Sequence, residues 1–364
     1  MLAILFSMVA MVKAGGAVKT QAIVHSNAAC DCEDQNLCKP LSTAPAKREV
    51  FAFFDSNNTW PNLDFSTMTT ACAFTQVDPA LVCHAHKMGV RVTKKAPFDV
   101  SQINNASART AWVQAQLASV QSQGLDGLNI DIEGYSGMPG PLTALVTELY
   151  NSMKQWHPQS QLSFDLAIFP NGQSQHYDHK ALAKVLDFIV PMAYDEPWSS
   201  HVAAANSPIH NLNVGISQYA ELGVPASKLV IGLPWYGWDY PCVAKEGVCH
   251  VDPPAGSPWF GWATQIGYSD IIKLQQSAGG PISMDAPTVT KYFDYNATSG
   301  KSRGRHQVWY DDPQTLQSKY AACQHAGVRG VAFWTADMPD YTNGEGTSMW
   351  NAINEGFPPP MSHQ

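Results

Sequence analysis

The chain has few charged residues and only a modest excess of acidic ones. Charged residues make up 14% of its 364 residues, and the formal net charge is −8. Lys and Arg never gather in clusters of more than two or three, so the sequence has no basic patch of the kind that binds nucleic acid. A mildly acidic protein of this kind suits a neutral ligand.

Long apolar runs are missing after the first residues. No later segment approaches the 18 apolar residues that a membrane-spanning helix needs, so we expect no membrane segment in the mature chain. Residues 1–17 are predicted to be a secretory signal, because the apolar stretch 2–12 is too short to span a bilayer and small residues follow it. Its first residues contain no Lys or Arg. The mature protein is expected to be a monomer.

A glycine-rich phosphate loop is also missing. None follows any predicted strand. This argues against a dinucleotide-binding sheet, which is the other fold in which strands and helices alternate along the chain. From about Arg48, short apolar runs alternate with amphipathic helical stretches, and this predicts a TIM (β/α)8 barrel over residues 48–360. The eight predicted strands are 50–54, 70–74, 90–94, 127–133, 162–168, 188–194, 229–235 and 330–335.

Capping residues mark the helix ends between these strands. Asp78 and Asp312 are predicted N-caps, and each is followed by a proline in the first helical position. Gly89, Gly124 and Gly327 are the predicted C-terminal stops of three helices.

Two segments do not fit the strand–helix repeat. Residues 18–47 form a cysteine-containing N-terminal segment ahead of the barrel. Residues 240–307 are rich in Pro, Gly and aromatic residues and are predicted to form an inserted subdomain. Inserts at the carboxyl ends of strands build the walls of clefts.

Eight cysteines indicate an oxidising compartment. Cys242 and Cys249 bracket a loop that a local disulfide could close, and Cys72 lies in a predicted strand as a candidate free thiol. The remaining cysteines leave several pairings open, and a zinc site at Cys30, Cys32 and Cys38 lacks a fourth ligand at a suitable spacing. The glycosylation triplets at Asn57, Asn105 and Asn296 fit secretory passage.

The stretch from Asp126 to Glu133 carries the strongest chemical signal. Asn129, Asp131 and Glu133 alternate with isoleucines, so in a strand all three polar side chains share one face. A half-solvated edge strand would look similar, but the flanking apolar residues favour a strand buried on both sides. Two neighbouring carboxyls cannot both ionise freely, so one of them is expected to be a general acid near neutral pH.

Other strand ends carry polar or aromatic residues. In a TIM barrel the active site lies at the carboxyl ends of the strands, so these side chains should meet at one mouth. Aromatic side chains there suit a sugar, because the apolar face of a pyranose stacks on an aromatic ring. These strand-end candidates are Asp55, Met192, Tyr194, Asp195, Trp235 and Trp334.

The stretch D-G-L-N-I-D-I-E resembles the D-G-x-D-x-D-x-E signature of family 18 glycoside hydrolases, and M-A-Y-D at 192–195 resembles a second motif of that family. The resemblance implies that Glu133 is the proton donor, that Asp131 handles the substrate acetamido group, and that Tyr194 holds its oxygen. It also implies that Trp334 lies under the sugar and that Asp126, Met192, Asp195, Trp235 and Asp55 contact the substrate.

Asn129 departs from the family pattern, in which an Asp is usual. Asn at this place is similar to the chitobiase branch of the family, as are the P-W-Y-G-W-D-Y-P-C run and the N-terminal cysteine segment. We expect Asn129 to donate a hydrogen bond to Asp131 and to favour its ionised form.

The resemblance implies a retaining glycosidase that uses the substrate acetamido group as nucleophile, without a metal or an organic cofactor. The expected substrate is an oligosaccharide with β-1,4-linked N-acetylglucosamine. Three functions stay open: a lysosomal chitobiase acting on the core of free Asn-linked glycans, a secreted chitinase, and a catalytically silent lectin. The presence of Glu133 favours an enzyme over the lectin.

Overall fold

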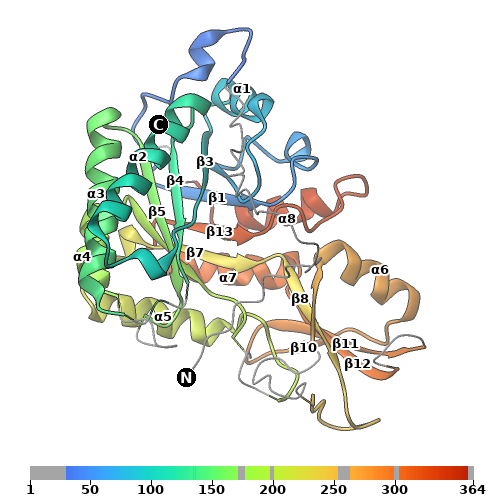
Figure 1. Ribbon diagram of the computed structural model, residues 1–364. Helices are drawn as coiled ribbons and strands as arrows, with labels where there is room; N and C mark the ends of the chain where they lie inside the picture. The colour runs from blue at the N-terminus through green and yellow to red at the C-terminus, as the bar shows by residue number, and fades with distance from the viewer. Residues whose placement is uncertain are drawn as a thin grey trace, which may run out of the picture.

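A computed structural model of the chain describes residues 30–133, 135, 137–170, 177–196, 201–252, 263–298 and 303–359. The predicted signal, 1–17, lies outside the described residues. Figure 1 shows a barrel with helices around it and, at the lower right, a second and smaller sheet. None of the helices within the described ranges is long and apolar enough to cross a membrane.

The barrel is closed and parallel, in the order β1-β13-β7-β6-β5-β4-β3-β2. Each predicted strand is present, so the predicted TIM barrel is confirmed. Two strands, β4 and β6, end two residues earlier than predicted, because the ladder between β4 and β5 stops at Asp131 and Asp165, and that between β5 and β6 stops at Met192. The barrel strands are β1 (Glu49–Phe54), β2 (Thr70–Ala73), β3 (Arg91–Ala96), β4 (Gly127–Asp131), β5 (Gln161–Ala167), β6 (Phe188–Met192), β7 (Val230–Pro234) and β13 (Gly330–Trp334).

The helices begin and end where the sequence indicates. Asp78 and Asp312 accept hydrogen bonds from the first turns of α1 and α7, as expected of N-caps. Gly89, Gly124 and Gly327 have positive φ angles of 75°, 66° and 67°, the left-handed conformation of a helix stop. The helices are α1 (Pro79–Lys87), α2 (Ala106–Gln123), α3 (Pro139–Trp156), α4 (His179–Val185), α5 (Ile209–Glu221), α6 (Tyr268–Ala278), α7 (Pro313–His325) and α8 (Glu345–Gly356).

Alternate residues of the barrel strands belong to two separate cores. On β1, Val50, Ala52 and Phe54 join the large cluster between the barrel and its helices, whereas Phe51 and Phe53 join a small cluster inside the barrel. Trp334 and Phe74 pack against this inner cluster. The inner core is therefore capped by aromatic rings at the carboxyl ends of the strands.

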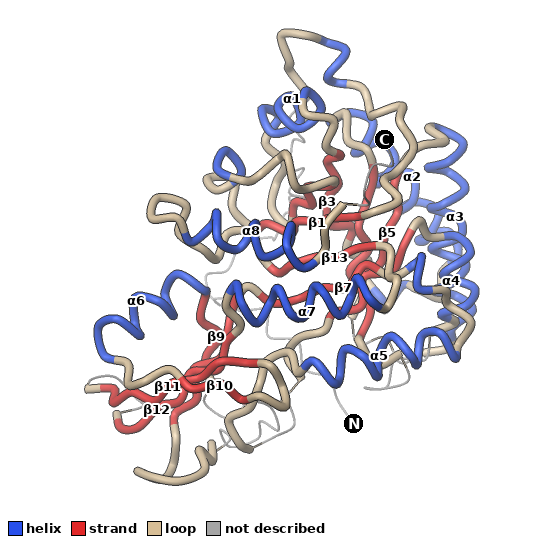
Figure 2. The backbone as a smooth tube through the Cα atoms, turned by 180° about the vertical axis from the view of Figure 1, so that it is seen from behind, coloured by secondary structure: helices blue, strands red, loops and turns tan. Residues whose placement is uncertain are grey.

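The second sheet confirms the predicted insertion. It has the strand order β10-β11-β12-β8-β9, and together with α6 it projects from one side of the barrel (Figure 2). Its first strand follows β7 after a single residue, so the sheet starts at Tyr236, before the predicted residue 240. Its strands are β8 (Tyr236–Pro241), β9 (Thr264–Gly267), β10 (Ser283–Asp285), β11 (Thr290–Ala297) and β12 (Gly304–Tyr310).

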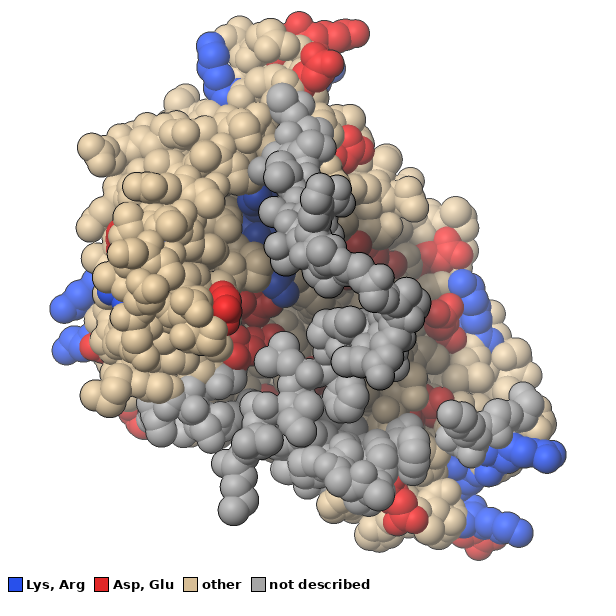
Figure 3. Space-filling view, viewed as in Figure 1, with Lys and Arg blue, Asp and Glu red and all other residues tan. Residues whose placement is uncertain are grey.

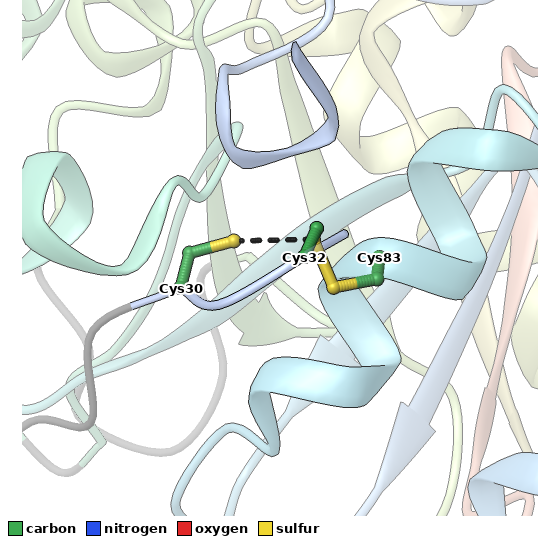
Figure 4. A group of neighbouring side chains, drawn as sticks. All are labelled: Cys30, Cys32 and Cys83. Atoms are coloured by element: carbon green, nitrogen blue, oxygen red, sulfur yellow. Dashed lines mark hydrogen bonds between the residues drawn. A yellow bond between two sulfur atoms is a disulfide. The ribbon is translucent and has the colours of Figure 1, made fainter. Parts of the chain in front are cut away.

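Disulfides attach the N-terminal segment and close the predicted loop. Cys30 pairs with Cys38, Cys32 with Cys83 of α1, and Cys242 with Cys249. The Sγ atoms of Cys30, Cys32 and Cys83 lie within 4.8 Å of one another (Figure 4), but all three are used in disulfides and cannot bind zinc as thiolates. Cys72 and Cys323 are free and buried.

Candidate active site

A pocket of about 190 Å³ opens at the carboxyl ends of the barrel strands. It brings together six of the predicted residues, namely Asp131, Glu133, Met192, Tyr194, Asp195 and Trp334. The other lining residues are Phe74, Asp165, Tyr236 and Gln265. Figure 3 shows acidic atoms gathered near the middle of this side of the molecule, with Lys or Arg atoms beside them.

Glu133 is the carboxyl best suited to donate a proton. It lies two residues beyond the end of β4 and keeps contact with solvent, although protein atoms surround most of its carboxyl. This partial desolvation, reinforced by the charge of Asp131, raises the pKa of Glu133 to about 7. Near neutral pH Glu133 therefore holds a transferable proton in many molecules, as expected from the sequence.

Asp131 forms an ion pair with Lys95 of β3. The Nζ of Lys95 lies 2.6 Å from Oδ2 of Asp131 and 4.7 Å from the ring centre of Phe74. The other oxygen, Oδ1, is buried and has no hydrogen-bond partner among the described residues. The cation thus lies against Oδ2, and Oδ1 is a buried acceptor whose hydrogen-bonding capacity is unused.

Asn129 bonds to the neighbouring strand instead of to Asp131. Its Nδ2 donates to Oδ1 of Asp165 at 2.9 Å and to Oγ of Ser163 at 3.0 Å. The expected hydrogen bond to Asp131 was therefore wrong, because Asn129 lies opposite Ser163 in the β4–β5 register and its amide reaches across to β5. Burial raises the pKa of Asp165 well above its usual range and so favours its neutral form.

Asp195 is held by donors from the second sheet. Its Oδ1 accepts hydrogen bonds from the Tyr236 hydroxyl at 2.6 Å and from the Trp238 indole at 3.0 Å, and its backbone N–H donates to Asn206 at 2.8 Å. Its φ angle of 60° is in the left-handed region, which non-glycine residues adopt rarely. Burial raises the pKa of Asp195 despite these donors. Beside it, the half-buried Tyr194 lies with its ring centre 6.0 Å from that of Tyr236.

Aromatic rings form the floor of the pocket. Trp334 packs edge-on against Phe74 at 4.6 Å and tilted on Phe53 at 5.4 Å between ring centres. The second predicted aromatic, Trp235, does not reach the floor. It is fully buried outside the barrel, stacked on Phe333 at 3.9 Å. It follows the last residue of β7, and its side chain points to the helices, so the prediction that it contacts the substrate was wrong.

Asp55 and Asp126 also lie outside the pocket. Asp55 lines an adjoining hollow, which shares Trp334 and Gln265 with the pocket. Asp126 precedes β4, at the opposite end of the barrel, where it accepts a hydrogen bond from His86 at 2.8 Å. Asp126 is a buried structural residue, and the expectation that it contacts the substrate was wrong because it belongs to the amino end of its strand.

Sequence reasoning missed Asp165, Lys95, Phe74, Tyr236 and Gln265. A signal existed for Asp165, since S-F-D at 163–165 repeats the polar–apolar–polar pattern of N-I-D at 129–131. No comparable signal marks Lys95, because Lys94 and Lys95 are adjacent and look alike in the sequence. In the strand the two side chains point to opposite faces. Lys94 donates a hydrogen bond to Ser119 of α2, whereas Lys95 forms an ion pair with Asp131.

Comparisons with known proteins agree with this geometry. Residues 92–339 match the glycosyl hydrolases of family 18. The chain is 34% identical to the di-N-acetylchitobiase of Mus musculus over 342 residues, which is 89% of this chain and 92% of that protein. It is also 34% identical to the di-N-acetylchitobiase of Homo sapiens, covering 86% of this chain and 84% of that protein.

Solved structures show the same fold. A chitinase from Chromobacterium violaceum superimposes with a TM-score of 0.70 at 17% identity, covering 85% of this chain and 98% of that chain. The pocket at the carboxyl ends of the strands, its acidic residues and its aromatic floor thus occur in a chain of known family. The chain belongs to family 18 of the glycosyl hydrolases and is a glycosidase.

Proposed function

We propose that this glycosidase hydrolyses β-1,4-linked N-acetylglucosamine with retention of configuration, and that the substrate's own acetamido oxygen is the nucleophile. The observation that carries the proposal is the pair formed by Glu133, whose pKa is raised to about 7, and Asp131, which is paired with Lys95. One carboxyl has a raised pKa while its neighbour is held against a cation, which suits the division of roles that acid catalysis next to a developing positive charge requires.

Each step of the proposed reaction is assigned to a residue of the pocket. Glu133 protonates the glycosidic oxygen, and the acetamido oxygen attacks the anomeric carbon to form an oxazolinium ion. Asp131 accepts a hydrogen bond from the acetamido N–H through its unpartnered Oδ1 and offsets the positive charge. Tyr194 orients the acetamido group, and the sugar ring stacks on Trp334. The ionised Glu133 then activates the water that opens the ring.

The other carboxyls of the pocket are poor nucleophiles. Burial raises the pKa of Asp165 and favours its neutral form, and Asp165 already accepts a hydrogen bond from Asn129. Asp195 accepts two hydrogen bonds from Tyr236 and Trp238 through one oxygen. These arrangements favour the substrate-assisted route over a covalent ester on the enzyme.

The substrate proposed is the chitobiose core of free Asn-linked oligosaccharides. Support comes from the identity to di-N-acetylchitobiases along most of the chain. Asn129, where the family signature has an Asp, adds a resemblance to that branch. The pocket volume of about 190 Å³ is also below the roughly 300–1,000 Å³ of sites that enclose a drug-sized ligand, and it suits a single ring.

Product analysis on chitotetraose and on its reduced form tests this proposal. A chitobiase should release single N-acetylglucosamine units from one end only, and should be sensitive to reduction if it recognises the reducing end. Random internal cleavage, unaffected by reduction, would instead identify a chitinase.

The adjoining hollow is the observation that favours a chitinase as the second candidate. It shares Trp334 and Gln265 with the pocket, so further sugar rings could extend into it. A silent lectin is the third candidate. The retained acid Glu133, with its raised pKa, disfavours the lectin.

A secretory route to the lysosome is proposed for the mature protein. The three disulfides support folding in an oxidising compartment. Among the glycosylation triplets, Asn296 is exposed on β11, whereas Asn57 donates its amide to the backbone of Gln76. Asn296 is therefore better placed to carry a glycan.

A further inference from the structure

The ion pair between Lys95 and Asp131 places a single cation inside a cluster of carboxyls. Glu133 follows Asp131 on the same segment, Asp165 lies directly opposite Asp131 on β5, and Asp195 lines the same pocket from the end of β6. Among the described residues lining this pocket none is Lys or Arg, so Lys95, which lies behind Asp131, is the cation that the pocket carboxyls meet.

Lys95 is fixed in position from two sides. Its Nζ contacts Asp131 at 2.6 Å and lies over the ring of Phe74, which itself packs on Trp334. The side chain of Lys95 is 34% exposed and that of Asp131 is 10% exposed, so the pair is partly shielded from solvent. A carboxyl this close to a fixed cation is favoured in its charged form over carboxyls farther away.

We propose that Lys95 is a positioning residue of the active site: it holds Asp131 as a carboxylate and so leaves the transferable proton on Glu133. The catalytic role of Lys95 rests on the proposed function, whereas its effect on the charge of Asp131 does not. The cation also engages Oδ2 of Asp131, and this leaves Oδ1 as the oxygen whose hydrogen-bonding capacity is unused.

The surroundings of the pair support this assignment. Lys95 lowers the pKa of Glu133, whereas burial and Asp131 raise it, so the cation moderates the acid as well as pairing with its neighbour. Other titratable groups near the pair come from β2, β5, the end of β6 and the residues just before α4, and all of them are acids: Cys72, Asp165, Tyr194, Asp195 and Tyr177. Without Lys95, the cluster would have to take up a further proton, and Asp131 is the group that loses its partner.

The test is a titration of the free enzyme by carboxyl-carbon NMR, with resonances assigned through Asp131→Asn and Glu133→Gln. In Lys95→Met, the midpoints of Asp131 and Glu133 should both move upward, that of Asp131 by about one pH unit or more. Lys95→Arg should bring the Asp131 midpoint back to within about 0.3 units of wild type. An Asp131 midpoint that is unchanged in Lys95→Met would overturn the proposal.

Lys94→Met is the matched control, because Lys94 lies on the same strand but faces Ser119 of α2. It removes the same charge from β3 and should leave both midpoints in place. If Lys95→Met does not fold, Lys95→Gln takes its place in the titration.

Activity supplies an independent readout. In Lys95→Met, the acid limb of kcat/KM should move to higher pH, and Lys95→Arg should restore it. A uniform fall in activity at every pH would show a merely structural role. If the wild type does not cleave N-acetylglucosamine linkages at all, the proposed function fails, while the titration still decides the role of Lys95.

Discussion

The amide of Asn129 donates a hydrogen bond of 2.9 Å to the carboxyl of Asp165, across the boundary between β4 and β5. Asn129 is fully buried, and Asp165 is 3% exposed. The third carboxyl of the site thus lies on the strand next to the one where the family signature places it. This carboxyl is shielded from water, and its partner Asn129 is a group that cannot ionise.

Asn129→Asp should therefore lower stability in a pH-dependent way. Two buried carboxyls would then face each other, and the pKa of the new one should be raised above its unfolded value of about 3.9. A buried acid of this kind costs stability above its unfolded pKa, and we expect a loss of about 1–3 kcal/mol at pH 8 that largely disappears near pH 4. Urea unfolding at the two pH values measures it.

The exposed Asn151 on α3 provides the control for this change. Asn151→Asp adds the same charge to the surface and should be close to neutral at both pH values. Equal pH dependence in the two variants would mean that Asn129 is only a packing residue.

Glu133→Gln should lower kcat by about 10²–10⁴-fold, because only the transferable proton is lost. The side chain keeps its size, so binding of chitobiose, measured by calorimetry, should stay close to that of the wild type. Hydrolysis within tenfold of wild type would remove Glu133 from its assigned role. In the wild type, the alkaline limb of kcat/KM should report the ionisation of Glu133, near pH 7.

Substrates without a 2-acetamido group should not be cleaved. The proposed nucleophile belongs to that group, and the pocket carboxyls other than Glu133 are buried, paired or hydrogen-bonded. Matched nitrophenyl glycosides of N-acetylglucosamine and glucose measure this difference. Mass spectrometry that traps a sugar ester on Asp131 would show an ordinary double displacement instead.

His86 should make the protein more stable at acid pH. Burial alone would lower the pKa of His86, but the hydrogen bond and the charge of Asp126 outweigh it, and the pKa is raised above 6.5. A raised pKa stabilises the fold fully below the unfolded value of about 6.5, and this contribution is lost as pH rises through the folded value.

His86→Gln tests this through the melting temperature at several pH values. The variant should lose several degrees at pH 5, since it leaves the buried Asp126 without its cation, and less at pH 8 and above. His84→Gln, an exposed position two residues earlier on α1, should give a small and pH-independent change. If the loss of melting temperature in His86→Gln does not depend on pH, His86 is uncharged in the folded protein.

The strand-end residues of the pocket were predictable because the alternation of apolar and polar residues fixes both the strand and the face. Asp131, Tyr194 and Trp334 follow from that rule. The rule fails where the direction of the side chain depends on neighbouring elements. Trp235 also stands at a strand end, yet it points outward and donates its indole N–H to Tyr320 of α7.

Long-range pairing accounts for what the sequence could not show. Lys95 matters because β3 is paired with β4, where Lys95 lies opposite Asn129. His86 and Asp126 are 40 residues apart and meet only because α1 packs against β3, the strand paired with β4. Neither contact has a local pattern, since each depends on which element the closed barrel puts next to another.

The direct passage from β7 into β8 has a consequence for anyone who would redesign or shorten this enzyme. Tyr236 and Trp238 belong to the inserted sheet, yet both hold Asp195, a residue from the end of a barrel strand. Trimming the insert would leave that carboxyl with neither of its two side-chain donors. An insert taken from a relative would have to supply two equivalent aromatic donors. The barrel and its insertion therefore cannot be exchanged independently of each other.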